Sequence, residues 1–199
     1  MVSTMVEHST GLYAKLALGL LSISTLFAWI AYTCTGWGEA VSGPLAGTHY
    51  GLWRVCSDNK YTPGCVTTDG WANDWYAASQ ALVTFGFFGI NAALVLQMVY
   101  MFKPGCVGSI EVAVPTALIC FITGLLYLIG IIVYGAKFGE DFVNPADSDP
   151  NWGEYKLGYS FALSVVALVF ELVAGLLLIL DAKANVVNTC ETSARSCHT

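Results

Sequence analysis

Four long apolar stretches, separated by polar segments of unequal length, dominate the pattern of the chain. A transmembrane helix needs about 20 mostly apolar residues, and each stretch reaches that length. The predicted spans cover residues 12–32, 76–102, 110–134 and 159–180. Charged side chains within them are few: Lys15 and Glu111 lie near span starts, and Glu171 lies inside the fourth span. We therefore expect a single membrane domain, residues 1–199, that crosses the bilayer four times.

Composition excludes the other broad classes of protein. Only 11% of the 199 residues are charged, against roughly 25% in soluble domains. Aromatic residues make up 13% of the chain, whereas disordered chains are poor in them. A net charge of −6, with only 8 Lys and Arg residues, argues against binding to nucleic acid. The lipid bilayer is therefore the expected environment, and we expect no nucleic-acid partner.

The segments between the spans indicate how the chain is oriented. An even number of spans places both termini on one side. Cys56 and Cys65 lie nine residues apart among turn residues, and a disulfide between them would contribute up to roughly 3 kcal/mol and needs an oxidising compartment. We therefore expect a multi-pass protein of the plasma membrane with segments 34–75 and 135–158 outside the cell. The segments expected in the cytosol are residues 1–11, 103–109 and 181–199.

The first outer segment has the pattern of a small sheet. Between Cys34 and Trp75, short runs of aromatic and β-branched residues alternate with Gly, Pro and Asn, which is typical of short strands and turns. We expect an antiparallel sheet, joined by the Cys56–Cys65 disulfide, on the ends of the helices. Tryptophan favours the membrane interface. Interfacial anchoring is the simplest interpretation of the tryptophans that flank the spans, which are Trp37, Trp71 and Trp75.

These residues resemble the signature of the claudin and peripheral myelin protein superfamily, which also includes the epithelial membrane proteins. The signature is carried here by Trp37, Gly51, Leu52, Trp53, Cys56 and Cys65. Together with four spans and a long first outer segment, the resemblance covers essentially the whole chain. It implies a membrane α-helical fold: a left-handed four-helix transmembrane bundle with a small extracellular antiparallel β-sheet closed by the cysteine pair. It also implies that Leu52 and Trp53 pack the sheet against the bundle.

Different segments resemble different branches of this superfamily. Residues 142–145 and 156–158 are similar to the second outer segment of claudins, although the spacing after Lys156 differs. Residues 77–81 are closer to epithelial membrane proteins, whereas residues 51–56 resemble stargazin-type channel auxiliary subunits and the lens fibre membrane protein. These resemblances imply three alternative functions. The first is a paracellular barrier or cation-favouring pore at cell–cell junctions, formed by self-association in cis and in trans. The second is an auxiliary subunit of an ion channel, and the third is an adhesive protein of myelin or lens type.

Negative charge gathers in the two outer segments. Of the total of −6, the first outer segment carries −2 and the second −3. Acidic side chains that line a narrow gap lower the barrier to cations, although simple solvation is the alternative role. The candidate charge-selective residues are Asp58, Asp69, Asp74, Glu140, Asp141, Asp147 and Asp149.

Within the spans, a carboxyl group and a pair of small residues need an explanation. An ionised Glu171 near mid-membrane would cost roughly 2.5–3.5 kcal/mol. It could contact a partner helix, but we favour a hydrogen bond inside the bundle, for which the candidate partners are Asn91, Gln97, Thr123 and Ser164. Gly89 and Ala93 form a small-xxx-small step, which permits close helix approach. We expect that step to pack within one molecule.

No arrangement of side chains indicates catalysis. His8, His49 and His198 are dispersed over both sides of the membrane, and the chain has no phosphate-binding loop or metalloprotease motif. We therefore expect no enzymatic activity, no cofactor and no metal site. Cys106, in the short cytosolic segment, is a candidate for S-palmitoylation. The position of this cysteine beside the membrane resembles that of cysteines in claudins.

Overall fold

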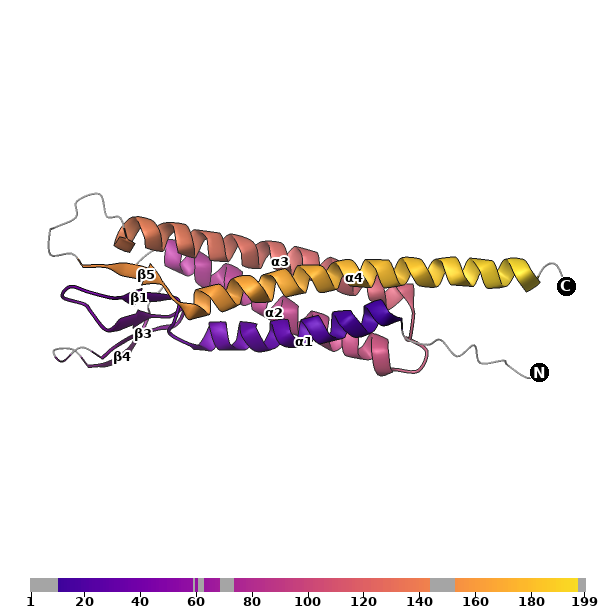
Figure 1. The fold of residues 1–199 in the computed structure, drawn as a ribbon, viewed down its shortest axis with the longest axis horizontal. Helices are drawn as coiled ribbons and strands as arrows, with labels where there is room; N and C mark the ends of the chain where they lie inside the picture. The colour runs from indigo at the N-terminus through magenta and orange to yellow at the C-terminus, as the bar shows by residue number, and fades with distance from the viewer. Residues whose placement is uncertain (1–10, 59, 61–62, 69–73, 144–152, 197–199) are drawn as a thin grey trace.

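The computed structural model describes most of the chain. The described residues are 11–58, 60, 63–68, 74–143 and 153–196. Within them, four helices lie side by side in a bundle (Figure 1). They are α1 (Leu12–Thr33), α2 (Asp74–Phe102), α3 (Ile110–Phe138) and α4 (Tyr159–Ser196). Each is long and apolar enough to cross a membrane, so the expected four-helix membrane architecture is confirmed.

Glycine and proline mark the helix ends at the tight connection between α2 and α3. Pro104 lies two residues after Phe102, the last residue of α2, and Gly105 and Gly108 have φ values of 88° and 70°, which side chains other than glycine rarely adopt. Pro115 is the sixth residue of α3, so its missing N–H removes one helical hydrogen bond, to the Glu111 carbonyl, in the second turn. The connection is therefore short enough to hold α2 and α3 antiparallel and adjacent.

A sheet lies at one end of the bundle, while the start of α1 and the end of α4 lie at the other (Figure 1). Its strands in the described residues are antiparallel, in the order β4-β3-β2-β1-β5. They are β1 (Gly38–Ala40), β2 (Thr48–Tyr50), β3 (Arg54–Ser57), β4 (Gly64–Thr67) and β5 (Tyr155–Leu157). Four come from the first connecting segment and the fifth from the second, which the sequence pattern did not predict.

The strand register separates two faces of the sheet, because residues directly opposite one another share a face. Ala40 pairs with Tyr155 and Tyr50 with Val55. The side chains of Ala40, Tyr155 and Tyr50 are buried against the bundle. The other face carries a row formed by Lys156, Glu39, His49, Cys56 and Cys65. One face therefore anchors the sheet, and the other presents polar groups and the disulfide.

Helix α4 is much longer than the span predicted for it. It runs for 38 residues, about 57 Å at 1.5 Å per residue, and extends well beyond the other helices (Figure 1). Gly175 is its last glycine, and no proline follows. Because nothing in residues 176–196 breaks a helix, α4 does not stop where its apolar stretch ends near Leu180.

Small residues bring α2 and α3 together in the bundle core. A Cβ atom added to Gly86 would overlap the Tyr127 side chain, and one added to Gly89 would overlap Thr123. Ala93, one turn further along α2, is fully buried. The small-xxx-small step of Gly89 and Ala93 therefore packs within one molecule, as expected.

Candidate functional site

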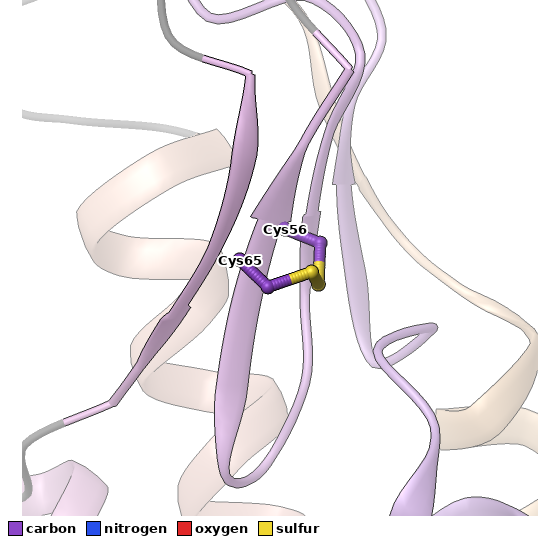
Figure 2. Close-up of a disulfide and its surroundings, with 2 residues drawn as sticks. All are labelled: Cys56 and Cys65. Atoms are coloured by element: carbon purple, nitrogen blue, oxygen red, sulfur yellow. A yellow bond between two sulfur atoms is a disulfide. The ribbon is translucent and has the colours of Figure 1, made fainter.

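The disulfide joins the two outermost strands on one side of the sheet. Cys56 of β3 and Cys65 of β4 are directly opposite in the register, with their Cα atoms 4.0 Å apart. Figure 2 shows the two side chains meeting between the neighbouring strands. All four residues of β4 are exposed, so little packing holds this strand. The predicted disulfide is confirmed, and it supplies a link between β3 and β4 that packing does not.

The Gly51–Trp53 segment fastens the sheet to α2. The Gly51 carbonyl accepts a hydrogen bond from the Tyr76 hydroxyl, and the Leu52 carbonyl accepts one from Gln80 Nε2 at 2.8 Å. Leu52 is fully buried. A Cβ atom on Gly51 would lie 2.8 Å from the Cα atom of Thr35 and 2.9 Å from the Arg54 carbonyl oxygen. Only glycine therefore fits at the position where the turn crosses the end of α1.

Trp53 contributes less to this attachment than Leu52. Its side chain remains 37% exposed, and its ring centroid lies 5.5 Å from that of Tyr32 on α1. The resemblance implied that both residues pack the sheet on the bundle. In the structure Leu52 enters the core, whereas Trp53 covers the outer end of α1.

Trp37 corrects the expectation that the flanking tryptophans anchor at the membrane interface. It is fully buried, 4.9 Å from the Tyr134 ring and 6.1 Å from the Phe161 ring. Its indole N–H donates to the Ala31 carbonyl at 2.6 Å. That carbonyl belongs to the last turn of α1, where helix carbonyls lack intrahelical partners. Trp37 is therefore a core residue that completes a helix end, while Trp71 lies outside the described residues.

An aromatic layer separates the sheet from the helices. Tyr134 and Phe138 of α3 stack with centroids 5.7 Å apart, and Tyr50 of β2 meets Phe138 edge to face at 5.7 Å. Burial, followed by the nearby Tyr155 and Tyr76 hydroxyls, raises the pKa of Tyr50 to about 12. The sheet is therefore packed on the bundle through large, neutral rings.

The candidate acidic residues fall into different environments. Glu140 forms an ion pair with Lys137 at 2.6 Å, and Asp141 accepts a hydrogen bond from Trp75 Nε1 at 2.8 Å. Both acidic residues belong to η2 (Gly139–Val143), a π-helical continuation of α3. Neither Asp58, which follows β3, nor Asp74, the first residue of α2, has a cationic partner within the described part of the chain. Three further candidates lie outside the described residues: Asp69, Asp147 and Asp149.

Other polar groups join the two connecting segments and were not singled out from the sequence. Lys156 of β5 forms an ion pair with Glu39 of β1 at 3.6 Å. The backbone N–H of Val41 donates to the Glu154 carbonyl at 2.7 Å, and the Glu154 N–H donates to the Ser42 hydroxyl at 2.9 Å. Strands from both connecting segments therefore form one continuous sheet. The alternation of Tyr155, Lys156 and Leu157 was the available signal, but three residues are too few to predict a strand.

Inside the bundle, Glu171 is fully buried. The Thr123 hydroxyl lies 2.8 Å from its Oε1 atom and 2.6 Å from the Ile119 carbonyl. Of the partners considered for Glu171, only Thr123 contacts it, because Gln97 binds the Ala14 carbonyl and Ser164 binds the Phe161 carbonyl. The structure therefore places this carboxyl group within the bundle and away from the lipid-facing surface.

At the opposite end from the sheet, a polar cluster links α2 to α4. The Tyr100 hydroxyl donates to Asp181 Oδ2 at 2.6 Å, and Asn185 Nδ2 lies 3.3 Å from the same oxygen. Asp181 is buried, although the sequence pattern placed it just past the fourth span.

Cys106, a half-buried free thiol in the connection between α2 and α3, remains only a predicted modification site.

Comparison with known proteins bears on the whole of this arrangement. The model of the PMP-22/EMP/MP20/Claudin family matches residues 1–178. A search of curated proteins finds no significant match. The matched residues include the buried Trp37, the Gly51–Trp53 anchor and the Cys56–Cys65 disulfide. This chain belongs to the PMP-22/EMP/MP20/Claudin family.

Proposed function

We propose that this multi-pass membrane protein is a structural protein of cell–cell junctions. The sheet lies outside the cell, both termini lie in the cytosol, and the sheets of neighbouring molecules associate. Together they form a paracellular barrier or a pore that favours cations. The role is structural, not catalytic.

The open edge of the sheet is the observation that carries this proposal. Strand β4 is the last strand on its side of the described sheet, and all of its residues are exposed. Val66 is the most exposed of its apolar side chains, at 67%. An unprotected strand edge pairs readily with another chain. The disulfide links β4 to β3. The backbone groups at the edge of β4 are therefore already positioned to pair with a strand of a neighbouring molecule.

The disulfide also supports the proposed orientation. Disulfides persist in oxidising compartments and are rare in the cytosol. Cys56 and Cys65 are bonded within the sheet, which supports an extracellular position for this end of the bundle. The starts and ends of the helices alternate, so the start of α1 and the end of α4 then lie on the cytosolic side.

Charge at the sheet end of the bundle supports a preference for cations. Asp58, Asp74 and Glu154 are exposed and have no cationic side chain as a partner in the described residues. Over both connecting segments the formal charge is −5. A narrow gap lined by fixed negative charge concentrates cations and repels anions.

Expression in cells that lack junctional strands tests this function. We expect the wild-type protein to concentrate at cell–cell contacts and to form strands in freeze-fracture images. Val66→Asp places a charge on β4, the exposed edge of the sheet, and should abolish the junctional strands in freeze-fracture images. Val187→Asp, at a side chain that is 56% exposed at the other end of the molecule, is the matched control and should leave them intact.

Two outcomes would contradict the proposal. One is an absence of strands and of contact enrichment in cells that display the wild-type protein at their surface. The other is purification of the protein in mild detergent as one copy bound to an ion channel in fixed ratio, which would instead assign it the role of an auxiliary channel subunit.

A further inference from the structure

A carboxamide group lies on the lipid-facing side of α2. Asn91 accepts a hydrogen bond from Trp29 Nε1 at 3.1 Å and donates one to the Phe87 carbonyl at 2.7 Å. A carboxamide has two N–H donors and two acceptor sites. One donor and one acceptor of Asn91 therefore have no partner within the described part of the chain. Asn91 is partly exposed, and its partner Trp29 is half exposed on the surface of α1.

The depth of Asn91 makes these free groups costly. Asn91 lies eleven residues before Phe102, the last residue of α2, which corresponds to about 16 Å along the helix axis. The hydrocarbon core of a bilayer is about 30 Å thick. Asn91 is therefore near the middle of the membrane, where neither water nor lipid headgroups reach it. Acyl chains offer no hydrogen-bond partner, and unsatisfied polar groups are strongly disfavoured there.

The surroundings of Asn91 fit a helix-to-helix contact. Phe88 and Val95 lie one turn on either side of it along α2, and both are exposed. Leu26, one turn before Trp29 on α1, is also exposed. Ala92 adjoins Asn91 and is exposed, and a small side chain allows another helix to approach closely. We call Leu26, Trp29, Phe88, Asn91, Ala92 and Val95 the Asn91 patch.

We propose that a second copy of this protein covers the Asn91 patch in the same membrane. Two copies inserted in the same direction can be related by a two-fold axis along the membrane normal, which brings one patch onto the other. The free donor of each Asn91 then binds the free acceptor of the other. A carboxamide is self-complementary in this way, so an identical chain satisfies both groups at once. The contact involves α1 and α2, not the sheet, so it goes beyond the proposed junctional function and does not depend on it.

Förster energy transfer between labelled copies of the full chain in phosphatidylcholine vesicles tests this contact. We expect transfer that falls as the protein is diluted in lipid, as for a reversible dimer. Asn91→Leu keeps an apolar side chain of similar size but removes both intermolecular hydrogen bonds. It should weaken dimerisation by about tenfold.

A second variant separates the contact from the fold of the monomer. Asn91→Leu also removes the acceptor for Trp29, whereas Ala92→Trp leaves every hydrogen bond of the chain in place and blocks close approach. Ala162→Trp, at an exposed alanine of α4, is the matched control. We expect Ala92→Trp to abolish energy transfer and Ala162→Trp to preserve it.

Several results would overturn the contact. One is the finding that the wild-type protein is monomeric in vesicles. This finding would overturn the contact even if the protein captured a different membrane protein from cells. Another is equal dimerisation by wild type, Asn91→Leu and Ala92→Trp. Energy transfer lost in Val66→Asp but unchanged in Asn91→Leu would assign the association to the sheet, leaving the junctional proposal intact. Junctional strands that persist in Asn91→Leu, while its energy transfer in vesicles falls, would support the contact as a separate one.

Discussion

The indole N–H of Trp37 donates to the carbonyl oxygen of Ala31 across 2.6 Å. Ala31 lies in the last turn of α1, and Trp37 lies just before β1. The backbone N–H of Trp37 also donates to the Tyr50 carbonyl, and its carbonyl accepts from Gly158 N. One residue therefore connects the end of the first helix, the second strand and the start of the fourth helix. The position of the sheet on the bundle depends on this connection.

Replacing Trp37 with phenylalanine should destabilise the protein. The variant loses the hydrogen bond to Ala31 and leaves a void beside Tyr134, at a cost of about 1–3 kcal/mol. Equilibrium unfolding of the purified protein in a mixed-micelle denaturant series measures this. Trp53→Phe is the matched control. Because Trp53 is partly exposed and its ring packs on Tyr32 at the outer end of α1, its loss should be below about 1 kcal/mol. Equal losses would show that the Trp37 hydrogen bond contributes nothing.

Adding one methyl group between α2 and α3 should also be costly. In Gly89→Ala the new Cβ atom overlaps the Thr123 side chain, so the helices must separate, at a cost of about 1–3 kcal/mol. Gly19→Ala is the matched control, because nothing lies within 4 Å of a Cβ atom there. That change should be neutral or stabilising by up to about 1 kcal/mol. Thermal unfolding in detergent compares the two, and similar behaviour of both variants would contradict the close approach.

How far the sequence predicts this fold depends on how far apart along the chain the interacting residues lie. Membrane spans follow from local hydropathy, and the Cys56–Cys65 link follows from cysteines in one short hairpin, so both were predictable. Strand β5 was not, because Tyr155 has to meet Ala40, more than a hundred residues earlier. The burial of Trp37 depends in the same way on Tyr134.

The candidate site shows the same limit. The acidic residues were recognisable as a group, but their pairing was not. Glu140 is neutralised by a lysine one turn away, which helical spacing could have suggested. Asp141 serves as the acceptor for Trp75, 66 positions away, and no local pattern signals such a contact.

Removing the disulfide should loosen one hairpin and leave the bundle intact. Among the described residues, the double variant Cys56→Ser and Cys65→Ser leaves β4 attached only by its ladder to β3, since its side chains are exposed. Amide hydrogen exchange of residues 54–67 should accelerate at least tenfold, corresponding to part of the roughly 3 kcal/mol that a link of this size contributes. Exchange in α2 and α3 should not change. Cys106→Ser, which removes a free thiol at the other end, is the control. Unchanged exchange in the hairpin would show that packing, not the disulfide, holds β4.

Alkaline pH should weaken the attachment of the sheet through Tyr50. Its pKa is raised to about 12 in the folded protein, against about 10 for an exposed tyrosine. Below pH 10 the phenol is neutral in both folded and unfolded chains, so stability does not depend on its titration. Between pH 10 and 12 only the unfolded chain loses the proton, and stability therefore falls as pH rises.

Comparison with Tyr50→Phe isolates this effect from the other groups that titrate at high pH. The difference in unfolding free energy between wild type and Tyr50→Phe should shift against the wild type between pH 8 and pH 11. The shift should reach at most about 1.4 kcal/mol. A difference between wild type and Tyr50→Phe that stays constant with pH would mean that the Tyr50 ring meets solvent, and the aromatic layer would then not seal the sheet onto the bundle.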